Sequence, residues 1–140
     1  MAVTPLVIAA APILFGPEWR AAYGGTDCDV VLETNSGARR RVEVKATGRH
    51  AFQELKEKDL RANFLVWVRF GRRYEIGSGP IQLCVLENPG HYIPRPCRLD
   101  TVRFERIVGV AANQRLLSFS SLADLLCTAR DGVLEHPANR

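Results

Sequence analysis

The chain has 140 residues, of which 46% are hydrophobic and 24% charged, and its formal net charge is +4. This length suits a single domain covering residues 1–140, and the composition excludes an intrinsically disordered chain. The weakly basic balance permits a polyanionic partner without requiring one.

The four cysteines are widely spaced along the chain. Secreted disulfide scaffolds carry cysteines at a higher density, and zinc sites usually contain closely spaced pairs. We therefore interpret them as buried structural thiols and predict a cytoplasmic protein. They are Cys28, Cys84, Cys97 and Cys127.

The first predicted element is the apolar segment 3–15, which Pro5 and Pro12 interrupt. It is shorter than the ~20 residues that a membrane-spanning helix needs. No basic residue precedes Arg20, so the segment also lacks the positively charged start of a secretory signal. We expect a core strand or helix, which could pack against a partner subunit, and no membrane association.

The next elements form a short helix and a hairpin. Pro17 suits the first turn of a helix over 17–23, which Gly24 and Gly25 would end. Segments 27–34 and 40–45 are predicted strands, and the Asn-Ser-Gly sequence at 35–37 is typical of a hairpin turn.

The remaining segments complete a mixed α/β domain with a central β-sheet flanked by helices. The spacing of apolar residues predicts a helix over 52–63, with Asp59 falling among the apolar positions. Further predictions are strands at 64–70, 81–86 and 102–110, an extended loop at 87–100, and a helix at 121–129 with a capping-box-like start.

The hairpin carries the residues with the clearest chemical potential. Because side chains alternate along a strand, Arg41, Glu43 and Lys45 share one face. Val42 and Val44 then face the core on the other side. A carboxylate and an ammonium are therefore expected side by side.

The register of the hairpin decides whether a second acid joins them. An odd loop centred on Ser36 places Asp29 opposite Glu43, with the Cβ atoms ~5 Å apart. A two-residue loop would instead pair Asp29 with Val44 and turn it to the wrong face. With the odd loop, two carboxylates can share one Mg²⁺, and Lys45 can orient water and stabilise a phosphoryl transition state.

Asp29, three apolar residues, a hairpin turn and Glu43-Val44-Lys45 together resemble the PD-(D/E)xK nuclease superfamily, which includes restriction endonucleases and archaeal Holliday-junction resolvases. The resemblance covers about residues 25–70 and implies a restriction-endonuclease-like core and a metal-dependent DNA endonuclease. It makes Asp29 and Glu43 ligands of Mg²⁺, for which Mn²⁺ can substitute, and Lys45 the catalytic lysine. It also places Gln53 near the site, at the start of a helix.

Two positions depart from the family pattern or only partly fit it. Cys28 stands where the proline that names the superfamily would be. Glu18 could be the extra acid that a preceding helix often supplies, but its predicted helix is short and close to the hairpin.

Basic residues concentrate around the proposed site. Residues 39–73 hold eleven Lys and Arg but four Asp and Glu. Such clustering is typical of a surface that binds a nucleic-acid backbone, although the basic residues of the helix can equally pair with its own acids. The predicted contacts are Arg39, Arg40, Arg41, Arg49, His50, Lys56, Arg72 and Arg73.

Three alternatives remain open at this point. The charged strand face can be a plain solvated surface. The chain can also be an inactive nuclease-like module that binds nucleic acid or builds an assembly, or a protein-interaction domain that docks through the apolar segment near Leu6. An enzyme that cuts both DNA strands needs two sites, so we predict a homodimer.

Overall fold

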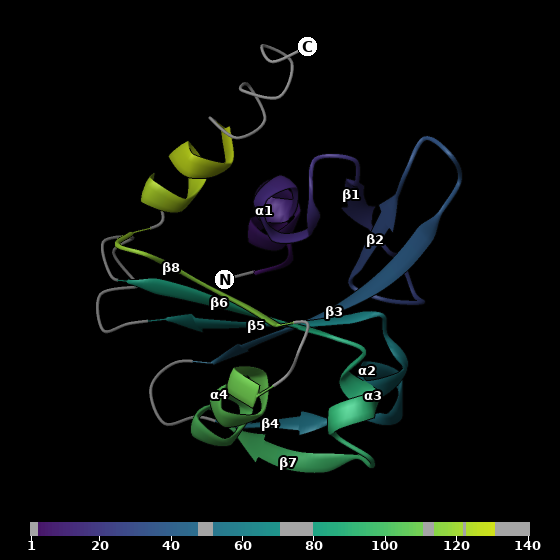
Figure 1. Cartoon of the computed structure of the whole chain (residues 1–140), viewed down its shortest axis with the longest axis vertical. Coiled ribbons are helices and arrows are strands. Elements are labelled where there is room, and N and C mark those ends of the chain that lie inside the picture. Colours follow the sequence, from purple (N-terminus) through teal and green to yellow (C-terminus); the bar gives the residue numbers. More distant parts are fainter. Residues whose placement is uncertain (1–2, 48–51, 71–79, 111–113, 122, 131–140) are drawn as a thin grey trace.

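The computed structural model describes residues 3–47, 52–70, 80–110, 114–121 and 123–130. A curled six-stranded sheet, in the order β1-β2-β3-β5-β6-β8, separates two layers (Figure 1). Its strands are β1 (Arg20–Tyr23), β2 (Val30–Glu33), β3 (Arg39–Thr47), β5 (Phe64–Phe70), β6 (Ile81–Glu87) and β8 (Gln114–Phe119).

The strand directions make this sheet mixed, as predicted. Strands β1, β2 and β3 form an antiparallel meander, and β5 then pairs in parallel with β3. Strands β6 and β8 continue antiparallel from β5. The predicted strands at 64–70 and 81–86 and the hairpin between β2 and β3 are confirmed.

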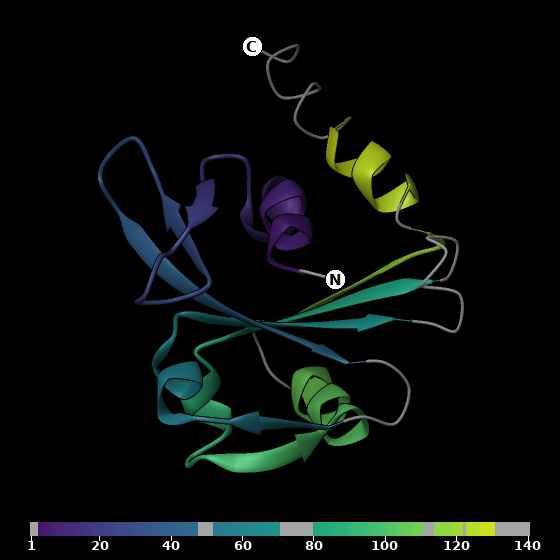
Figure 2. The same cartoon turned by 180° about the vertical axis from the view of Figure 1, so that it is seen from behind.

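One face of the sheet is covered by α1 (Thr4–Phe15) and by a helix over residues 123–130. Figure 2 shows both helices on the same side. The α1 residues that are buried recur at helical spacing: Leu6, Val7, Ala10, Ala11 and Leu14. They join a core that includes Leu125 of the second helix, so the helical alternative for 3–15 and the helix predicted near 121–129 are confirmed.

Because α1 buries this stripe against its own sheet, the expectation that the segment around Leu6 exposes an apolar docking surface is wrong for these residues. Within the described part of the chain, no helix is both long and apolar enough to cross a bilayer.

The opposite face carries a second layer. It consists of β4 (Phe52–Leu55), α2 (Glu57–Arg61), α3 (Pro89–Tyr92), β7 (Cys97–Asp100) and α4 (Thr101–Val110). Strands β4 and β7 pair with each other in a separate two-stranded sheet. A second core fills the space beneath them, where the rings of Trp67 and Phe104 lie 4.6 Å apart.

Two predicted helices are wrong in whole or in part. Residues 17–23 do not form a helix, because 20–23 pair with β2 and become the edge strand β1. The segment 52–63 divides into β4 and the short helix α2. Here the backbone hydrogen bonds that β7 offers to β4 outweigh the local helical pattern.

Two further predictions fail between residues 87 and 110. The expected loop contains α3 and β7, and the expected strand at 102–110 is the helix α4. The Asp100 carboxylate accepts a hydrogen bond from the Arg103 backbone amide at 2.7 Å, as an N-terminal helix cap does. With Phe104 buried and Val102 exposed, the burial also follows a helix better than a strand.

Candidate active site

The two predicted acids meet at the open end of the β2–β3 hairpin. Val30 pairs with Val42 and Glu33 with Arg39, so the loop is odd and position 29 lies opposite position 43. Of the two registers considered from the sequence, the structure therefore has the odd loop that the proposed site requires. Asp29 itself lies just before strand β2, which begins at Val30. Its carboxylate accepts a hydrogen bond from the Val44 backbone amide of β3 at 2.8 Å, which continues the pairing of the two chain segments.

Glu43 points away from the α1 core and into the face covered by α2. Val42 is buried in the α1 core and Val44 packs against it, so the predicted alternation along β3 is confirmed. Glu43 is 2% exposed. The alternative of a plain solvated strand face is therefore wrong for this residue, because the crossover between β3 and β5 covers that face.

The Glu43 carboxyl and the Asp29 carboxylate are coupled. Burial raises the pKa of Glu43 from 4.5 to about 7, and the hydrogen bond and negative charge of Asp29 act in the same direction. The charge of Lys58 opposes this rise. Near neutral pH the buried Glu43 side chain can therefore keep its proton beside the Asp29 carboxyl group.

Lys45 shares the face of Glu43 but is bound to another acid. Its Nζ atom lies 3.1 Å from Oδ2 of Asp59, which belongs to α2. The Lys45 side chain is 19% exposed and that of Asp59 is fully buried. Lys58 of the same helix approaches Glu43, with Nζ 3.6 Å from Oε2. Glu43 therefore contacts Asp29 and Lys58, and Lys45 contacts Asp59, while Lys45 shares only the strand face with Glu43.

Asp59 and Lys58 are the residues that the sequence did not assign to the site. Asp59 occupies an apolar-spaced position of the predicted helix, and a carboxylate at such a position is a signal of a buried charge with a function. Lys58 gives no comparable signal, because its side chain is 56% exposed and resembles any surface lysine.

Gln53 lies close to this network, on β4 rather than at a helix start. Its Nε2 donates a hydrogen bond to the Ala46 carbonyl oxygen at 2.7 Å. The amide therefore fixes the backbone of β3 one residue beyond Lys45. The predicted proximity to the site holds, but the described contact is with backbone and not with the acids.

Glu18 does not join the acids. It follows the C-terminal end of α1, where its carboxylate folds toward Gly16. The opposite end of α1 is the one near Asp29, since Thr4 and Asp29 line the same pocket. A helix of 12 residues is ~18 Å long, which separates Glu18 from the site.

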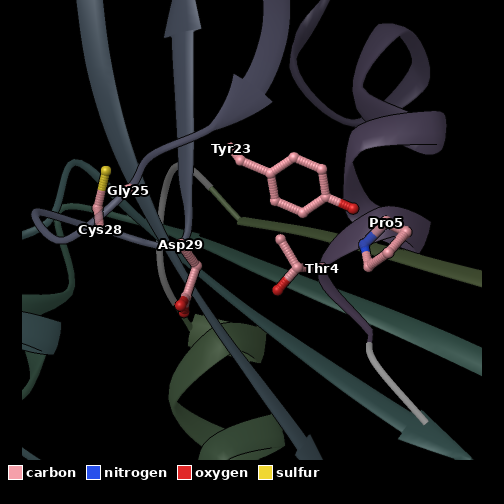
Figure 3. A pocket seen from close by; sticks show the side chains of 6 residues that line it. All are labelled: Thr4, Pro5, Tyr23, Gly25, Cys28 and Asp29. Carbon is pink, nitrogen blue, oxygen red and sulfur yellow. The ribbon is translucent and has the colours of Figure 1, made fainter.

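That pocket has a volume of about 400 Å³ and lies where α1 meets the start of β2. Figure 3 shows Tyr23, Thr4 and Pro5 around one part of it and Asp29 at another. The Tyr23 side chain is largely exposed. The pocket gives access to the Asp29 end of the carboxyl pair from the side opposite α2.

The three consecutive arginines lie toward the turn of the hairpin. Arg39 pairs with Glu33 at 3.7 Å, and Arg40 lies over the Trp19 ring at 5.7 Å. The Arg41 guanidinium donates to the Arg61 carbonyl oxygen at 3.0 Å. Position 39 is ~20 Å along β3 from Lys45. Along β3, Arg41 is therefore the closest of the three arginines to Glu43 and Arg39 is the farthest.

The other predicted nucleic-acid contacts divide into two groups. Lys56 is exposed at the start of α2, next to the network around Asp59. Arg49, His50, Arg72 and Arg73 lie outside the described residues.

The residues at the acid pair suit a small divalent cation. Asp29 and Glu43 offer two adjacent carboxyl groups whose mutual repulsion a cation would relieve, and Mg²⁺ commonly takes a few carboxylates and fills its remaining positions with water and phosphate. Among the residues that the structure describes, no group of three or more His, Cys, Asp or Glu side chains could hold a metal.

No known protein family, curated protein or solved structure matches the chain.

Proposed function

We propose that the chain is a metal-dependent DNA endonuclease with a restriction-endonuclease-like core, which hydrolyses phosphodiester bonds at Asp29, Glu43 and Lys45. The observation that carries the proposal is that the Asp29 and Glu43 carboxyl groups lie against each other, with Lys45 on the same face of β3 as Glu43. Metal-assisted phosphodiester hydrolysis can use this combination of metal ligands and a fixed cation.

Each residue has a distinct role in the proposed reaction. Asp29 and Glu43 would hold Mg²⁺ or Mn²⁺, which supplies an acidified water and neutralises charge on the phosphate. The Val44 amide orients Asp29, so one ligand is fixed in advance. Lys45 stabilises the negative charge that develops on the phosphate, and Gln53 holds the β3 backbone beside it.

The arrangement of strands supports the fold assignment. The helix α1 precedes a three-stranded meander, a crossover follows, and β5 then pairs in parallel with β3. The apolar strand after the crossover therefore lies beside the strand that carries Glu43 and Lys45, in the same sheet. DNA as the nucleic acid rests on that resemblance.

A plasmid-nicking assay tests the proposal. Supercoiled DNA is incubated with the purified chain in Mg²⁺, Mn²⁺ or EDTA, and Glu43→Gln and Lys45→Met are compared with wild type. Each substitution keeps the approximate side-chain size, so folding and DNA binding are expected to persist while cleavage falls at least ~100-fold. Glu54→Gln, which neutralises an exposed acid on β4, is the matched control and should remain active.

The result separates catalysis from binding alone. Full Mg²⁺-dependent cleavage by both site variants would refute the assignment of these residues. Salt-dependent DNA binding without metal-dependent cleavage by the wild type would instead support the inactive, nucleic-acid-binding alternative.

We also propose that the enzyme acts as a homodimer, because two sites are needed to cut both strands of a duplex. Light scattering at micromolar concentration, with and without duplex DNA, tests this. A chain that stays monomeric under both conditions would contradict it.

A further inference from the structure

Asp59 occupies an unusual position for a charged residue. It is fully buried, and its Oδ2 atom receives both the Lys56 backbone amide at 2.8 Å and the Lys45 ammonium at 3.1 Å. Its Oδ1 atom has no hydrogen-bond partner among the described residues. A buried carboxylate destabilises a fold unless it is well paired, so capping a five-residue helix is a weak reason to keep one here.

The backbone around Asp59 is held in place from two sides. At the start of α2, the Lys56 backbone amide donates a hydrogen bond to the Asp59 carboxylate. The helix α3 packs closely against α2. A Cβ atom added to Gly90 would lie 2.7 Å from the Leu60 carbonyl oxygen, which shows how near α3 approaches. Asp59 is therefore a fixed anchor and not a mobile surface group.

What Asp59 anchors is the ammonium of Lys45. Lys45 and Glu43 are two positions apart on β3 and share a face, so Glu43 is another acid within reach of the Lys45 chain. Without Asp59, the ammonium is free to turn toward Glu43 and Asp29. A second protein cation held there, in addition to the exposed Lys58 ammonium that lies 3.6 Å from Glu43, would compete directly with a divalent metal.

We propose that Asp59 is a positioning residue that keeps the Lys45 ammonium off the Asp29–Glu43 pair, so that the pair is open to a divalent cation. This inference rests on the proposed function, since it assigns Asp59 a part in the same site. It also explains why the lysine is paired with a helix residue and not with its neighbour on the strand.

Binding of Mn²⁺ to the full chain without DNA provides the test, with free Mn²⁺ measured by electron paramagnetic resonance. Asp59→Asn keeps the shape of the side chain and removes its charge, and should weaken Mn²⁺ binding at least ~fivefold. In a Lys45→Met background the same substitution should weaken Mn²⁺ binding much less, because the competing ammonium is gone and only the direct charge effect of Asp59 on Glu43 is left. Glu57→Gln removes an exposed acid of the same helix that pairs with Arg61, and should bind Mn²⁺ like the wild type.

The outcomes distinguish this inference from the function it rests on. Wild-type protein whose Mn²⁺ binding is lost in Asp29→Asn but unchanged in Asp59→Asn would overturn the positioning role alone. The role is also overturned if Asp59→Asn weakens binding equally in the Lys45→Met background. Wild-type protein that binds no Mn²⁺ would overturn the proposed metal site itself and the inference with it.

A second measurement needs no variant and covers the case in which Asp59→Asn fails to fold. In a crystal structure of the wild-type chain with Mn²⁺ bound, the Lys45 ammonium should remain on Asp59. An ammonium that has left Asp59 for Glu43 or Asp29 in that structure would overturn the proposal.

Discussion

Glu43 and Asp29 face each other across the open end of the hairpin. Because Glu43 is buried, its protonation is sensitive to the neighbouring Asp29 carboxyl group. Glu43 is enclosed beneath α2, whereas Asp29 is held by the Val44 amide at 2.8 Å and lines a pocket. Burial and the neighbouring carboxylate raise the pKa of Glu43 to about 7. This pair should therefore leave a signature in the stability of the protein as well as in its activity.

The first prediction concerns stability against pH. Folding raises the pKa of Glu43 from 4.5 to about 7, so the folded protein binds this proton more tightly than the unfolded chain. The stabilisation is complete below the unfolded pKa and is lost as pH rises through the folded one. Relative to Glu43→Gln, which cannot titrate, the wild type should lose about 3 kcal/mol of unfolding free energy across that interval.

Urea unfolding of both proteins at about pH 5 and about pH 8, in metal-free buffer, measures this difference. Using the difference between the two proteins removes the contributions of other titrating groups. Parallel pH dependence for the wild type and the variant would show that Glu43 titrates normally.

The second prediction concerns the core beneath the second layer. Trp67 is buried and its ring lies 4.6 Å from that of Phe104 in α4, so this contact joins the main sheet to the layer that covers Glu43. Trp67→Ala should lower the unfolding free energy by about 3–5 kcal/mol. Val102→Ala removes an exposed side chain from the same helix and should stay within about 0.5 kcal/mol of wild type. Equal losses would contradict the placement of α4.

The third prediction uses the four free thiols. The interpretation of all four as buried thiols is wrong for two of them, because Cys127 is exposed and Cys97 is partly exposed, whereas Cys28 and Cys84 are buried. Burial raises the pKa of Cys84 to about 12, with the charge of Glu105 acting in the same direction, and burial also raises the pKa of Cys28. Since the thiolate is the reactive form, a disulfide reagent should modify Cys127 fastest and reach Cys28 and Cys84 after unfolding.

Absorbance stopped-flow with the reagent in excess resolves these phases. Cys127→Ser should remove the fastest phase and leave the slow ones intact. A rapid phase that persists in this variant would place another thiol at the surface.

The fourth prediction addresses DNA affinity. Lys56 is exposed beside the Asp59 network, so its ammonium is well placed to contact a phosphate close to the acids. Lys56→Ala should weaken binding to different DNA sequences uniformly. It should also reduce the slope of log binding constant against log salt concentration by about one. The measurement is a salt titration of binding by fluorescence anisotropy in EDTA.

Arg20→Ala is the matched control for charge. The Arg20 guanidinium binds the Asn35 side chain at 3.0 Å, near the hairpin turn and away from the acids. Its removal should leave the salt dependence closer to wild type than Lys56→Ala does. A larger effect at Arg20 would shift the proposed DNA path toward the turn of the hairpin.

The sequence by itself determined the hairpin and reduced its register to two alternatives, an odd loop and a two-residue loop. Side chains alternate on a strand whatever surrounds it, so the shared face of Glu43 and Lys45 follows from their spacing. The odd loop then places Asp29 opposite Glu43, as the pairing of Val30 with Val42 confirms. The same local reasoning identified the buried strand 64–70, whose apolar run has no other stable location.

Tertiary structure alone decided where segments with ambiguous local patterns went. Residues 52–55 became a strand because β7 offers them hydrogen bonds, although β7 begins more than 40 residues later. Likewise, residues 102–110 carry strand-forming side chains but form α4, in which Phe104 packs against Trp67 of β5. Partners that lie far away in sequence leave no trace in local periodicity.

The same limit applies to the site. Spacing brought Asp29, Glu43 and Lys45 together, but the burial of Glu43 and its contact with Lys58 depend on how the crossover folds back over β3. The ion pair between Lys45 and Asp59 joins a strand to a helix in the same way. Local geometry therefore fixed which groups can meet on the strand, and long-range packing fixed their solvation and their charge partners.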